Sequence, residues 1–128
     1  MNTPSELKYS KTHEWIKYED ETAAYIGITD YAQDSLGDLV FANLPEVGDE
    51  VEIGEAFGDL ESVKAVSDLI SPVSGTVDEV NGEILDSPEQ INADPYDAWF
   101  IKVSDITDTE ELIGSEEYDA FCAEEDNN

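Results

Sequence analysis

The chain contains no arginine, one cysteine, one methionine and one histidine, and each scarcity excludes a class of protein. A single thiol cannot form an internal disulfide, which is typical of proteins in a reducing compartment. One histidine cannot build a histidine-rich metal site. No stretch approaches the roughly 20 consecutive apolar residues that a transmembrane helix needs, and the polar residues 1–11 do not have the pattern of a secretory signal. We therefore expect a cytoplasmic protein.

Positive charge is equally scarce. Five lysines stand against 33 aspartates and glutamates, which gives a formal net charge of −28. A field of this sign repels phosphate backbones and anionic lipid, so neither nucleic acid nor a membrane surface is an expected partner. Because the screening length falls to about 3 Å in molar salt, the charge favours a salt-rich cytoplasm, such as that of a halophile. The alternative is that the acidity repels wrong partners in an ordinary cell.

The length of 128 residues fits one domain. High net charge is often a mark of disorder, but 40% of the residues are apolar. They occur in short alternating runs bounded by turn residues, which is the pattern of β-strands. Many short strands at this spacing predict a mostly β sandwich or barrel.

Local signals give the expected order of elements. We predict a hairpin over residues 14–28, a short helix over residues 31–36 that is capped by Thr29 and ends at Gly37, and strands from residue 39 to residue 82. A helical turn is predicted at residues 87–90 and a final buried strand at residues 98–103. A second capping box at residues 107–110 predicts a helix that stops at Gly114.

A last helix is expected from about Ser115. It would place Tyr118, Phe121 and Cys122 on one face, where the thiol is a core residue rather than a nucleophile.

Lys64 stands apart from the other lysines. It lies in residues 61–68 between two β segments, where a hairpin would lift it to the tip and leave its ammonium in water. From these residues alone, an ordinary surface lysine is the simplest interpretation. However, a glycine followed closely by a valine begins a strand on each side, at residues 47–54 and 71–77. Lys64 therefore lies near the centre of two similar units of turn and strand.

This arrangement resembles the carrier domains that display a lysine for lipoyl or biotinyl attachment. The resemblance implies a mostly β, barrel-sandwich hybrid of two small antiparallel sheets, with short helices at the periphery and a C-terminal helix. The whole chain, residues 1–128, would be a single lipoyl-carrier domain with its core at about residues 39–103 and the C-terminal helix at about residues 115–124. Biotin acceptors usually have methionine on both sides of the lysine, whereas Val63 and Ala65 flank Lys64, so lipoate is favoured.

Further motifs occur along the chain, in a specific order and spacing. They are Lys8-Tyr9, His13-Glu14-Trp15, residues 27–33, Leu36-Gly37, Leu44-Pro45, residues 61–65, Pro95-Tyr96 and residues 99–102. Together they resemble the H-protein family of the glycine cleavage system, over almost the entire chain from about Leu7 to Phe121.

The resemblance implies a carrier that is not itself an enzyme. Lys64 would hold lipoate in amide linkage, attached by a lipoate-attaching enzyme. The arm would take the aminomethyl group of glycine from a pyridoxal-phosphate decarboxylase, the P protein, and pass it to a folate-dependent aminomethyltransferase, the T protein. A flavin-linked dihydrolipoyl dehydrogenase, the L protein, would reoxidise it. The hard chemistry lies in the cofactors, and the carrier supplies positioning and shelter.

Three residues match positions that line the resting cleft of the arm in the family: Glu14, Thr12 beside it, and Asp68. A carboxylate in that cleft could form a charge-assisted hydrogen bond with a protonated amine. The plain alternative is that a given carboxylate of so acidic a chain is solvated, and that Asp68 serves a turn. Many relatives carry serine at the position of Thr12 and histidine at that of Tyr31. His13 is expected to be structural, packed near Trp15 with a satisfied ring nitrogen.

Two other functions stay open at this point. The chain could be a lipoyl donor that relays its cofactor to 2-oxoacid dehydrogenase complexes, which needs the same modified lysine. It could also be an unmodified binding module.

Overall fold

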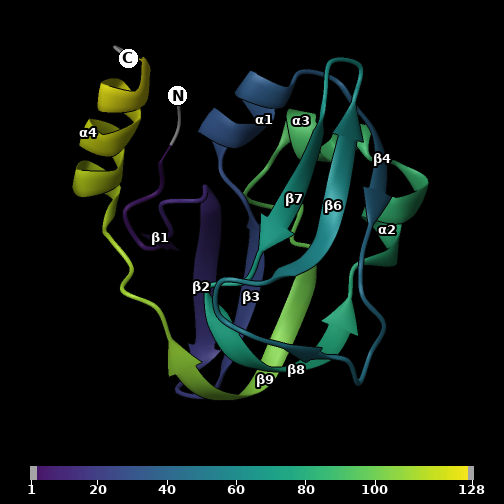
Figure 1. The fold of residues 1–128 in the computed structure, drawn as a ribbon, viewed down its shortest axis with the longest axis vertical. Coiled ribbons are helices and arrows are strands. Elements are labelled where there is room, and N and C mark those ends of the chain that lie inside the picture. Colours follow the sequence, from purple (N-terminus) through teal and green to yellow (C-terminus); the bar gives the residue numbers. More distant parts are fainter. Residues whose placement is uncertain (1–2, 127–128) are drawn as a thin grey trace.

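Two antiparallel sheets form the framework of the molecule (Figure 1). The structure, a computed structural model, describes residues 3–126. One sheet has the strand order β1-β2-β3-β9-β8-β5, and the other has the order β4-β6-β7. The strands are β1 (Lys8–Tyr9), β2 (Glu14–Asp20), β3 (Ala23–Ile28), β4 (Leu39–Asn43), β5 (Glu50–Val51), β6 (Ala56–Ser62), β7 (Val66–Ile70), β8 (Val73–Val80) and β9 (Ile101–Thr109). The helices are α1 (Asp30–Leu36), α2 (Gly82–Asp86), α3 (Glu89–Ala93) and α4 (Ser115–Asp126).

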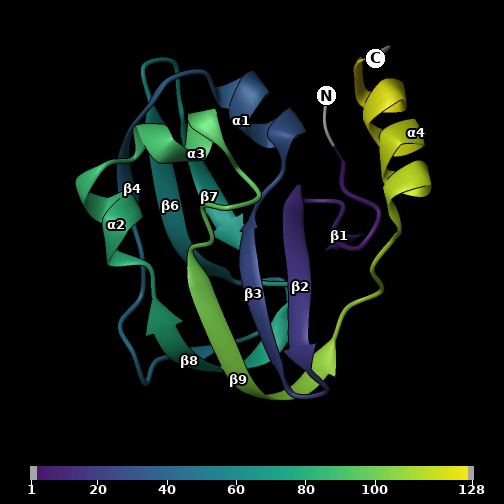
Figure 2. The same ribbon diagram turned by 180° about the vertical axis from the view of Figure 1, so that it is seen from behind.

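The main core lies between the sheets. Leu60 from the small sheet and Ile26, Val77 and Ile101 from the large one are at most 1% exposed. Burial alternates along several strands because successive side chains of a strand point to opposite faces. This confirms the prediction of a mostly β protein built from two antiparallel sheets, with short helices around them (Figure 2).

A second, aromatic cluster attaches α4 to the large sheet. Tyr118 and Cys122 are buried as expected, and Phe121 is half-buried at the edge of the cluster. The ring of Tyr9 stacks on that of Tyr118 at 4.7 Å between centroids. Thr3 Oγ1 donates a hydrogen bond of 2.8 Å to the Asp119 carboxylate, so the start of the described chain lies beside α4 (Figure 1).

The expected hairpin and first helix are both present. β2 and β3 pair with Trp15 opposite Gly27, which confirms the hairpin over residues 14–28. Thr29 Oγ1 accepts the amide hydrogen of Ala32 at 3.2 Å and caps α1. The helix ends at Gly37, whose φ of +82° suits a residue without a side chain.

The helix predicted from residues 107–110 is wrong. β9 runs through this segment and pairs with β8, with Ser74 opposite Asp108 and Val73 opposite Thr109. The ladder of backbone hydrogen bonds along β8 therefore overrides the local capping signal. The strand predicted at residues 98–103 begins later, at Ile101, and continues to Thr109.

The segment between β8 and β9 is more helical than predicted. Asn81 Oδ1 accepts the amide hydrogen of Glu83 at 3.1 Å and caps α2, a helix that was not predicted. The predicted helical turn is α3, but its N-cap is Pro88 rather than Ser87, and it has no side-chain capping bond. In the part of the chain that the structure describes, no helix is long and apolar enough to cross a membrane.

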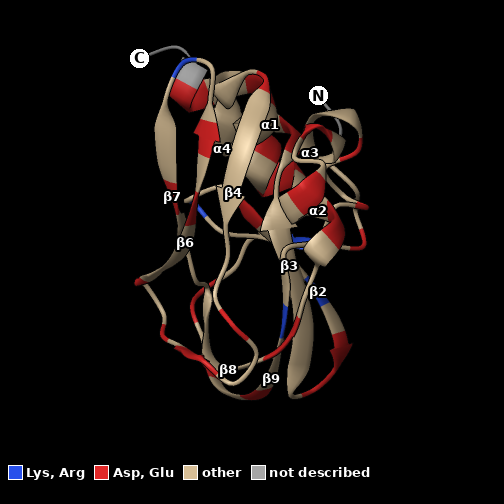
Figure 3. Ribbon diagram, turned by 90° about the vertical axis from the view of Figure 1, so that its right-hand side faces the viewer, with Lys and Arg blue, Asp and Glu red and all other residues tan. Residues whose placement is uncertain are grey.

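Acidic side chains occur on most elements, although β1, β3 and β4 have none. Figure 3 shows red segments along the helices, the strand ends and the loops, and few blue ones. Lys102 is one of the paired cations, with its Nζ 2.6 Å from a Glu19 carboxylate oxygen. The carboxylates of Glu19 and Glu79 raise the pKa of Lys102 above its ordinary value, chiefly through the hydrogen bond to Glu19.

Candidate functional site

The β6–β7 hairpin carries Lys64 at its tip. The side chain of Ser62 shapes the turn, because its Oγ accepts the amide hydrogens of Lys64 at 3.2 Å and of Ala65 at 3.0 Å. The Ser62 amide in turn donates to the Ala65 carbonyl at 2.8 Å. Lys64 is exposed and forms no ion pair with any residue from 3 to 126. The predicted presentation of this amine at the tip is confirmed.

The hairpin tip rests against the end of α1. The Val63 amide donates to the Asp38 carbonyl at 3.1 Å. The side chain of Lys64 lies over Gly37, where a Cβ atom would come within 3.2 Å of Lys64 Cε. A side chain at Gly37 would therefore displace the lysine as well as strain the backbone.

A cleft of about 290 Å³ opens beside this contact, between α1, the β6–β7 hairpin and the loop that precedes β2. Leu36, the neighbour of Gly37, belongs to its apolar lining, which also includes Ile28 and Leu60. The full lining is Thr12, His13, Glu14, Ile28, Tyr31, Ala32, Ser35, Leu36, Leu60, Ser67, Asp68, Leu69 and Glu125. The lining thus combines apolar side chains with polar and charged ones.

Glu14 is the buried acid of this cleft. Only 1% of the residue is exposed, and its Oε1 accepts hydrogen bonds from Ser10 Oγ at 2.8 Å and from Thr12 Oγ1. Its Oε2 accepts a long bond of 3.4 Å from the Ile70 amide. Burial raises the pKa of the Glu14 carboxyl to about 7, although the hydrogen bonds oppose the rise. Near neutrality this group therefore takes or releases a proton readily.

The structure brings Thr12, Glu14 and Asp68 into one cleft. Lys64 does not line this cleft, and its side chain lies against Gly37 instead. Asp68 lies within β7, opposite Asp59, so its suggested role in a turn is wrong. It is exposed, whereas Glu14 is enclosed. Of the three predicted cleft residues, Glu14 has by far the most unusual environment.

His13 is structural in a different way from the one expected. Its Nδ1 lies 2.7 Å from Tyr118 Oη and its Nε2 lies 2.9 Å from a Glu125 carboxylate oxygen, so both ring nitrogens have partners on α4. The ring packs against Tyr31 at 4.9 Å between centroids. Trp15 Nε1 instead bonds the Pro95 carbonyl. His13 therefore joins α4 to the cleft.

Sequence reasoning missed Ser10 and Glu125. Ser10 is fully buried, and its amide and hydroxyl both contact Glu14. The alternating hydroxyls of Ser10 and Thr12 before Glu14 were a usable signal, since a tight turn brings them onto one carboxylate. Glu125 had no comparable signal, because its place in the lining depends on how α4 docks.

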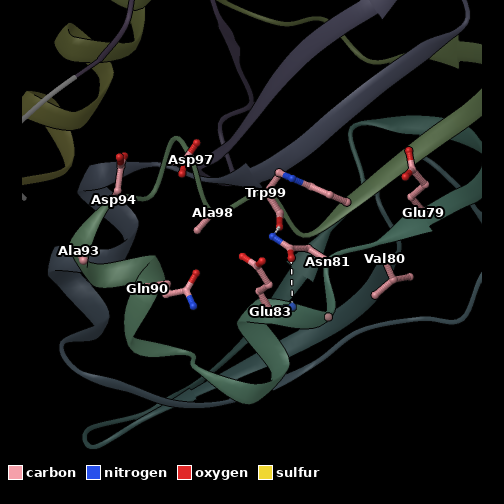
Figure 4. A pocket seen from close by; sticks show the side chains of 11 residues that line it. Glu79, Val80, Asn81, Glu83, Gln90, Ala93, Asp94, Asp97, Ala98 and Trp99 are labelled. Carbon is pink, nitrogen blue, oxygen red and sulfur yellow. Dashed lines mark hydrogen bonds between the residues drawn. The ribbon is translucent and has the colours of Figure 1, made fainter.

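A larger hollow of about 710 Å³ lies on another face, around the loop between β8 and α2 and the end of α3. Figure 4 shows Glu83, Asp94 and Asp97 around it, together with the ring of Trp99. Its lining has no lysine, cysteine or histidine and does not reach Lys64. Among the described residues, no cluster of three or more histidine, cysteine or acidic side chains is arranged to hold a metal ion. The cleft beside Lys64 is the better candidate.

Comparison with known proteins agrees with this geometry. The family described as glycine cleavage H-protein matches residues 7–125. The glycine cleavage system H protein of Lachnoclostridium phytofermentans is 57% identical over 125 residues, covering 98% of each chain. That of Halalkalibacterium halodurans is 56% identical over 127 residues, covering 97% of this chain and 98% of the relative. A crystal structure of the H protein of Mycobacterium marinum superposes with a TM-score of 0.85 at 44% identity, covering 91% of this chain and 96% of the other.

Proposed function

The chain belongs to the glycine cleavage H-protein family, and from this premise we propose which of its residues perform the carrier function. Its role is that of a lipoyl carrier in glycine cleavage. Lys64 is the residue that holds the lipoyl group. Glu14, Thr12 and Asp68 line the cleft in which the end of the arm rests with its cargo.

Support for Lys64 comes from its presentation. An amine that is to be acylated must reach the active site of another protein, and so it must be exposed and free of a permanent ion pair. Lys64 meets both conditions, and Ser62 holds its turn in one shape. Lys102, by contrast, lies among the carboxylates of Glu19, Asp78 and Glu79. The exposed, unpaired tip amine is the observation that carries the proposal.

The cleft suits the lipoyl group. Its lining offers apolar side chains to a hydrocarbon arm at Ile28, Leu36 and Leu60. Leu36 precedes Gly37, which lies against the side chain of Lys64. When attached, the group supplies a cyclic disulfide that accepts the aminomethyl group of glycine. The residues of this chain bind the arm, exclude water from its end and hold a proton near it.

Glu14 supplies the charge that a cationic cargo needs. Ser10 and Thr12 direct their hydroxyls at its carboxylate and leave Oε2 with only the long bond from Ile70. An ammonium in the cleft favours the ionised carboxylate, so its arrival would lower the pKa of Glu14 from about 7 and form a charge-assisted hydrogen bond. Asp68 adds a second, solvated carboxylate at the rim.

We further propose that the chain itself catalyses no step. H proteins are carrier components, and this one would exchange its cargo with the P, T and L proteins after a lipoate-attaching enzyme has loaded it. A relay to 2-oxoacid dehydrogenase complexes is not favoured, because the relatives compared above are all named for glycine cleavage. Tethering raises the local concentration of the cargo at each enzyme, which is the physical advantage of an arm.

The test is the mass of the protein isolated from cells grown with lipoate. We expect a lipoyl adduct on the peptide that contains Lys64. Lys64→Arg should fold normally, gain no adduct and support no glycine-dependent activity with the P, T and L proteins, because a guanidinium is not acylated. Lys11→Arg is the matched control and should behave as the parent protein. Activity retained by Lys64→Arg, or an unmodified parent protein, would mean that Lys64 is not the attachment residue.

A further inference from the structure

Large apolar side chains gather at the hairpin tip, on a surface that is otherwise acidic. Val40 is 56% exposed, Phe41 48%, Val63 68% and Val66 66%. We call these four residues the tip patch. The other exposed large apolar side chains among the described residues, Tyr18, Val47 and Leu85, come from three different parts of the chain. Single exposed apolar residues are ordinary, but four from neighbouring elements call for an explanation.

The strand register places Phe41 and Val66 on the same face of the small sheet, on either side of Glu61. Phe41 of β4 lies opposite Glu61 of β6, which lies opposite Val66 of β7, so all three side chains stand in one row. A β-bulge between Leu39 and Phe41 leaves both Val40 and Phe41 exposed. The amide of Val63 bonds the carbonyl just before β4. Figure 3 shows β4 without acidic residues.

The row lies on the side of the small sheet that faces away from the cleft. Neighbouring residues of a strand point to opposite faces, and Leu60, next to Glu61, points inward to the cleft and core. The contact of Lys64 with Gly37 therefore lies between two surfaces. On one side is the cleft proposed for the loaded arm, and on the other is the tip patch.

The reach of the lysine decides which partner must cover the patch. Before modification, Nζ stands only about 6 Å from its Cα, given five bonds of about 1.5 Å. An enzyme that acylates this atom must bring its catalytic centre within that distance, so it must cover the residues around the tip. After modification, the arm reaches roughly twice as far, and an enzyme that handles only its end can act without enclosing the hairpin.

We propose that the tip patch is the docking surface for the enzyme that attaches lipoate to Lys64. This inference rests on the proposed role of Lys64 and identifies the surface that the attaching enzyme binds. The step joins Nζ to the acyl carbon of a lipoyl adenylate, expels the nucleoside monophosphate and releases two protons from the ammonium. An apolar patch around a target amine suits an enzyme whose pocket holds a hydrocarbon acyl chain, and it gains binding energy from burying Phe41 and the valines.

The test measures lipoate attachment to the unmodified full-length chain by a lipoate ligase supplied with lipoic acid and ATP. For Phe41→Ser and Val66→Ser we expect the KM for the carrier to rise about tenfold with little change in kcat, as is typical for residues central to an interface. Val47→Ser is the matched control, because Val47 is equally exposed but lies in a different loop. Circular dichroism and melting in molar KCl would show that each variant folds.

A second measurement assigns the patch to the attachment step. After prolonged incubation that loads every variant fully, the variants should receive the aminomethyl group from the glycine decarboxylase with unchanged KM. Unchanged attachment kinetics in both patch variants would overturn the inference while leaving Lys64 as the attachment residue. A decarboxylase KM that rises as much as the ligase KM, or a dimer of the parent protein that Phe41→Ser dissolves, would also overturn it. A parent protein that takes up no lipoate at Lys64 would overturn the proposed function itself.

Discussion

Glu14 differs from the other carboxylates by where it lies rather than by its chemistry. Two hydroxyls converge on one of its oxygens, while the residue has almost no contact with solvent. The other acidic residues whose burial the structure describes are exposed or half-buried. Glu14 is instead held in a state in which protonated and ionised forms have similar free energies near neutral pH. A cargo amine can shift that balance.

This burial predicts a specific pH dependence of stability. The folded-state pKa of Glu14, about 7, is above its ordinary value, so the folded state retains a proton that the unfolded chain has already lost. The stability contributed by the protonated carboxyl is therefore complete below about pH 4.5 and is lost as the pH rises to about 7. Relative to Glu14→Gln, the free energy of unfolding of the parent protein should fall by about 3 kcal/mol across this range. Urea titrations at several pH values would measure it.

Glu21→Gln is the control for this comparison, because Glu21 is exposed in the turn between β2 and β3. It removes the same charge from the surface and should follow the parent curve. Parallel curves for the parent protein and Glu14→Gln would contradict the burial of an ionisable Glu14.

A second prediction concerns the cargo. Glu14→Ala should fold and accept lipoate, but lose the aminomethyl group to water about tenfold faster, since a charge-assisted hydrogen bond contributes roughly 1.5–3 kcal/mol. The measurement is the rate of amine release from the loaded protein. Glu21→Ala should release it at the parent rate. Equal rates for all three proteins would remove Glu14 from the arm cleft.

At the scale of single residues, sequence predicts what is isolated or part of a motif. Lys64 could be predicted because no other lysine lies near it and because turn signals flank it on both sides. Ser10 could also have been predicted, from the alternating hydroxyls before Glu14. The participation of Glu125 could not, because it depends on how a distant helix packs against His13.

At the scale of elements, one buried hydroxyl of α4 adds a polar connection to its aromatic packing. Tyr118 Oη lies 2.6 Å from Thr29 Oγ1 and 2.7 Å from His13 Nδ1. Thr29 also caps α1, so the same small network joins α4, α1 and the loop before β2. Burial raises the pKa of Tyr118 above its ordinary range, so the hydroxyl keeps its proton at any physiological pH.

Tyr118→Phe tests this attachment. We expect the free energy of unfolding to fall by about 1–3 kcal/mol, because the change leaves buried partners without a hydrogen bond. Hydrogen exchange should show the loss first in α4. Tyr18→Phe removes a hydroxyl that bonds Thr109 at the surface and should cost much less. Equal costs would mean that the buried network does not hold α4.

Local patterns predicted elements well where packing agreed with them and failed where pairing overrode them. Thr29 caps the start of α1 and Gly37 ends it, as expected for a threonine and a glycine at these positions. Residues 107–110 have an equally good capping pattern, yet β9 runs to Thr109. The reason is the backbone pairing with β8, which local sequence patterns do not predict. Such failures arise from long-range contacts and not from weak propensity.

At the scale of the whole molecule, the charge of −28 should make stability depend on salt. Screening by molar KCl reduces the repulsion among surface carboxylates. We expect the melting temperature to rise by several degrees between dilute buffer and molar KCl, because each kcal/mol is about 2–6 °C for a domain of this size. Melts in KCl and in sucrose separate screening from general exclusion effects. A melting temperature that does not respond to KCl would contradict the expected salt-rich cytoplasm.

Alternating strands and turn residues predicted a mostly β sandwich or barrel, and the resemblance to lipoyl carrier domains added the expectation of two antiparallel sheets. The extent of the large sheet could not be predicted, because β5 and the end of β9 join it through pairings between distant residues. The cleft also depends on tertiary packing, because its lining comes from α1, the β6–β7 hairpin, α4 and the loop before β2.

The hydrogen bond between Thr3 and Asp119 has a practical consequence for reagents. It sets the beginning of the described chain against the helix whose Glu125 borders the cleft. A purification handle or fluorophore fused near either end would thus crowd the docking of α4. The bend between β2 and β3, at Glu21 and Thr22, is exposed. It lies at the end of the molecule opposite to α4 (Figure 2). A label at this bend would allow the carrier to be followed without disturbing α4 or the cleft.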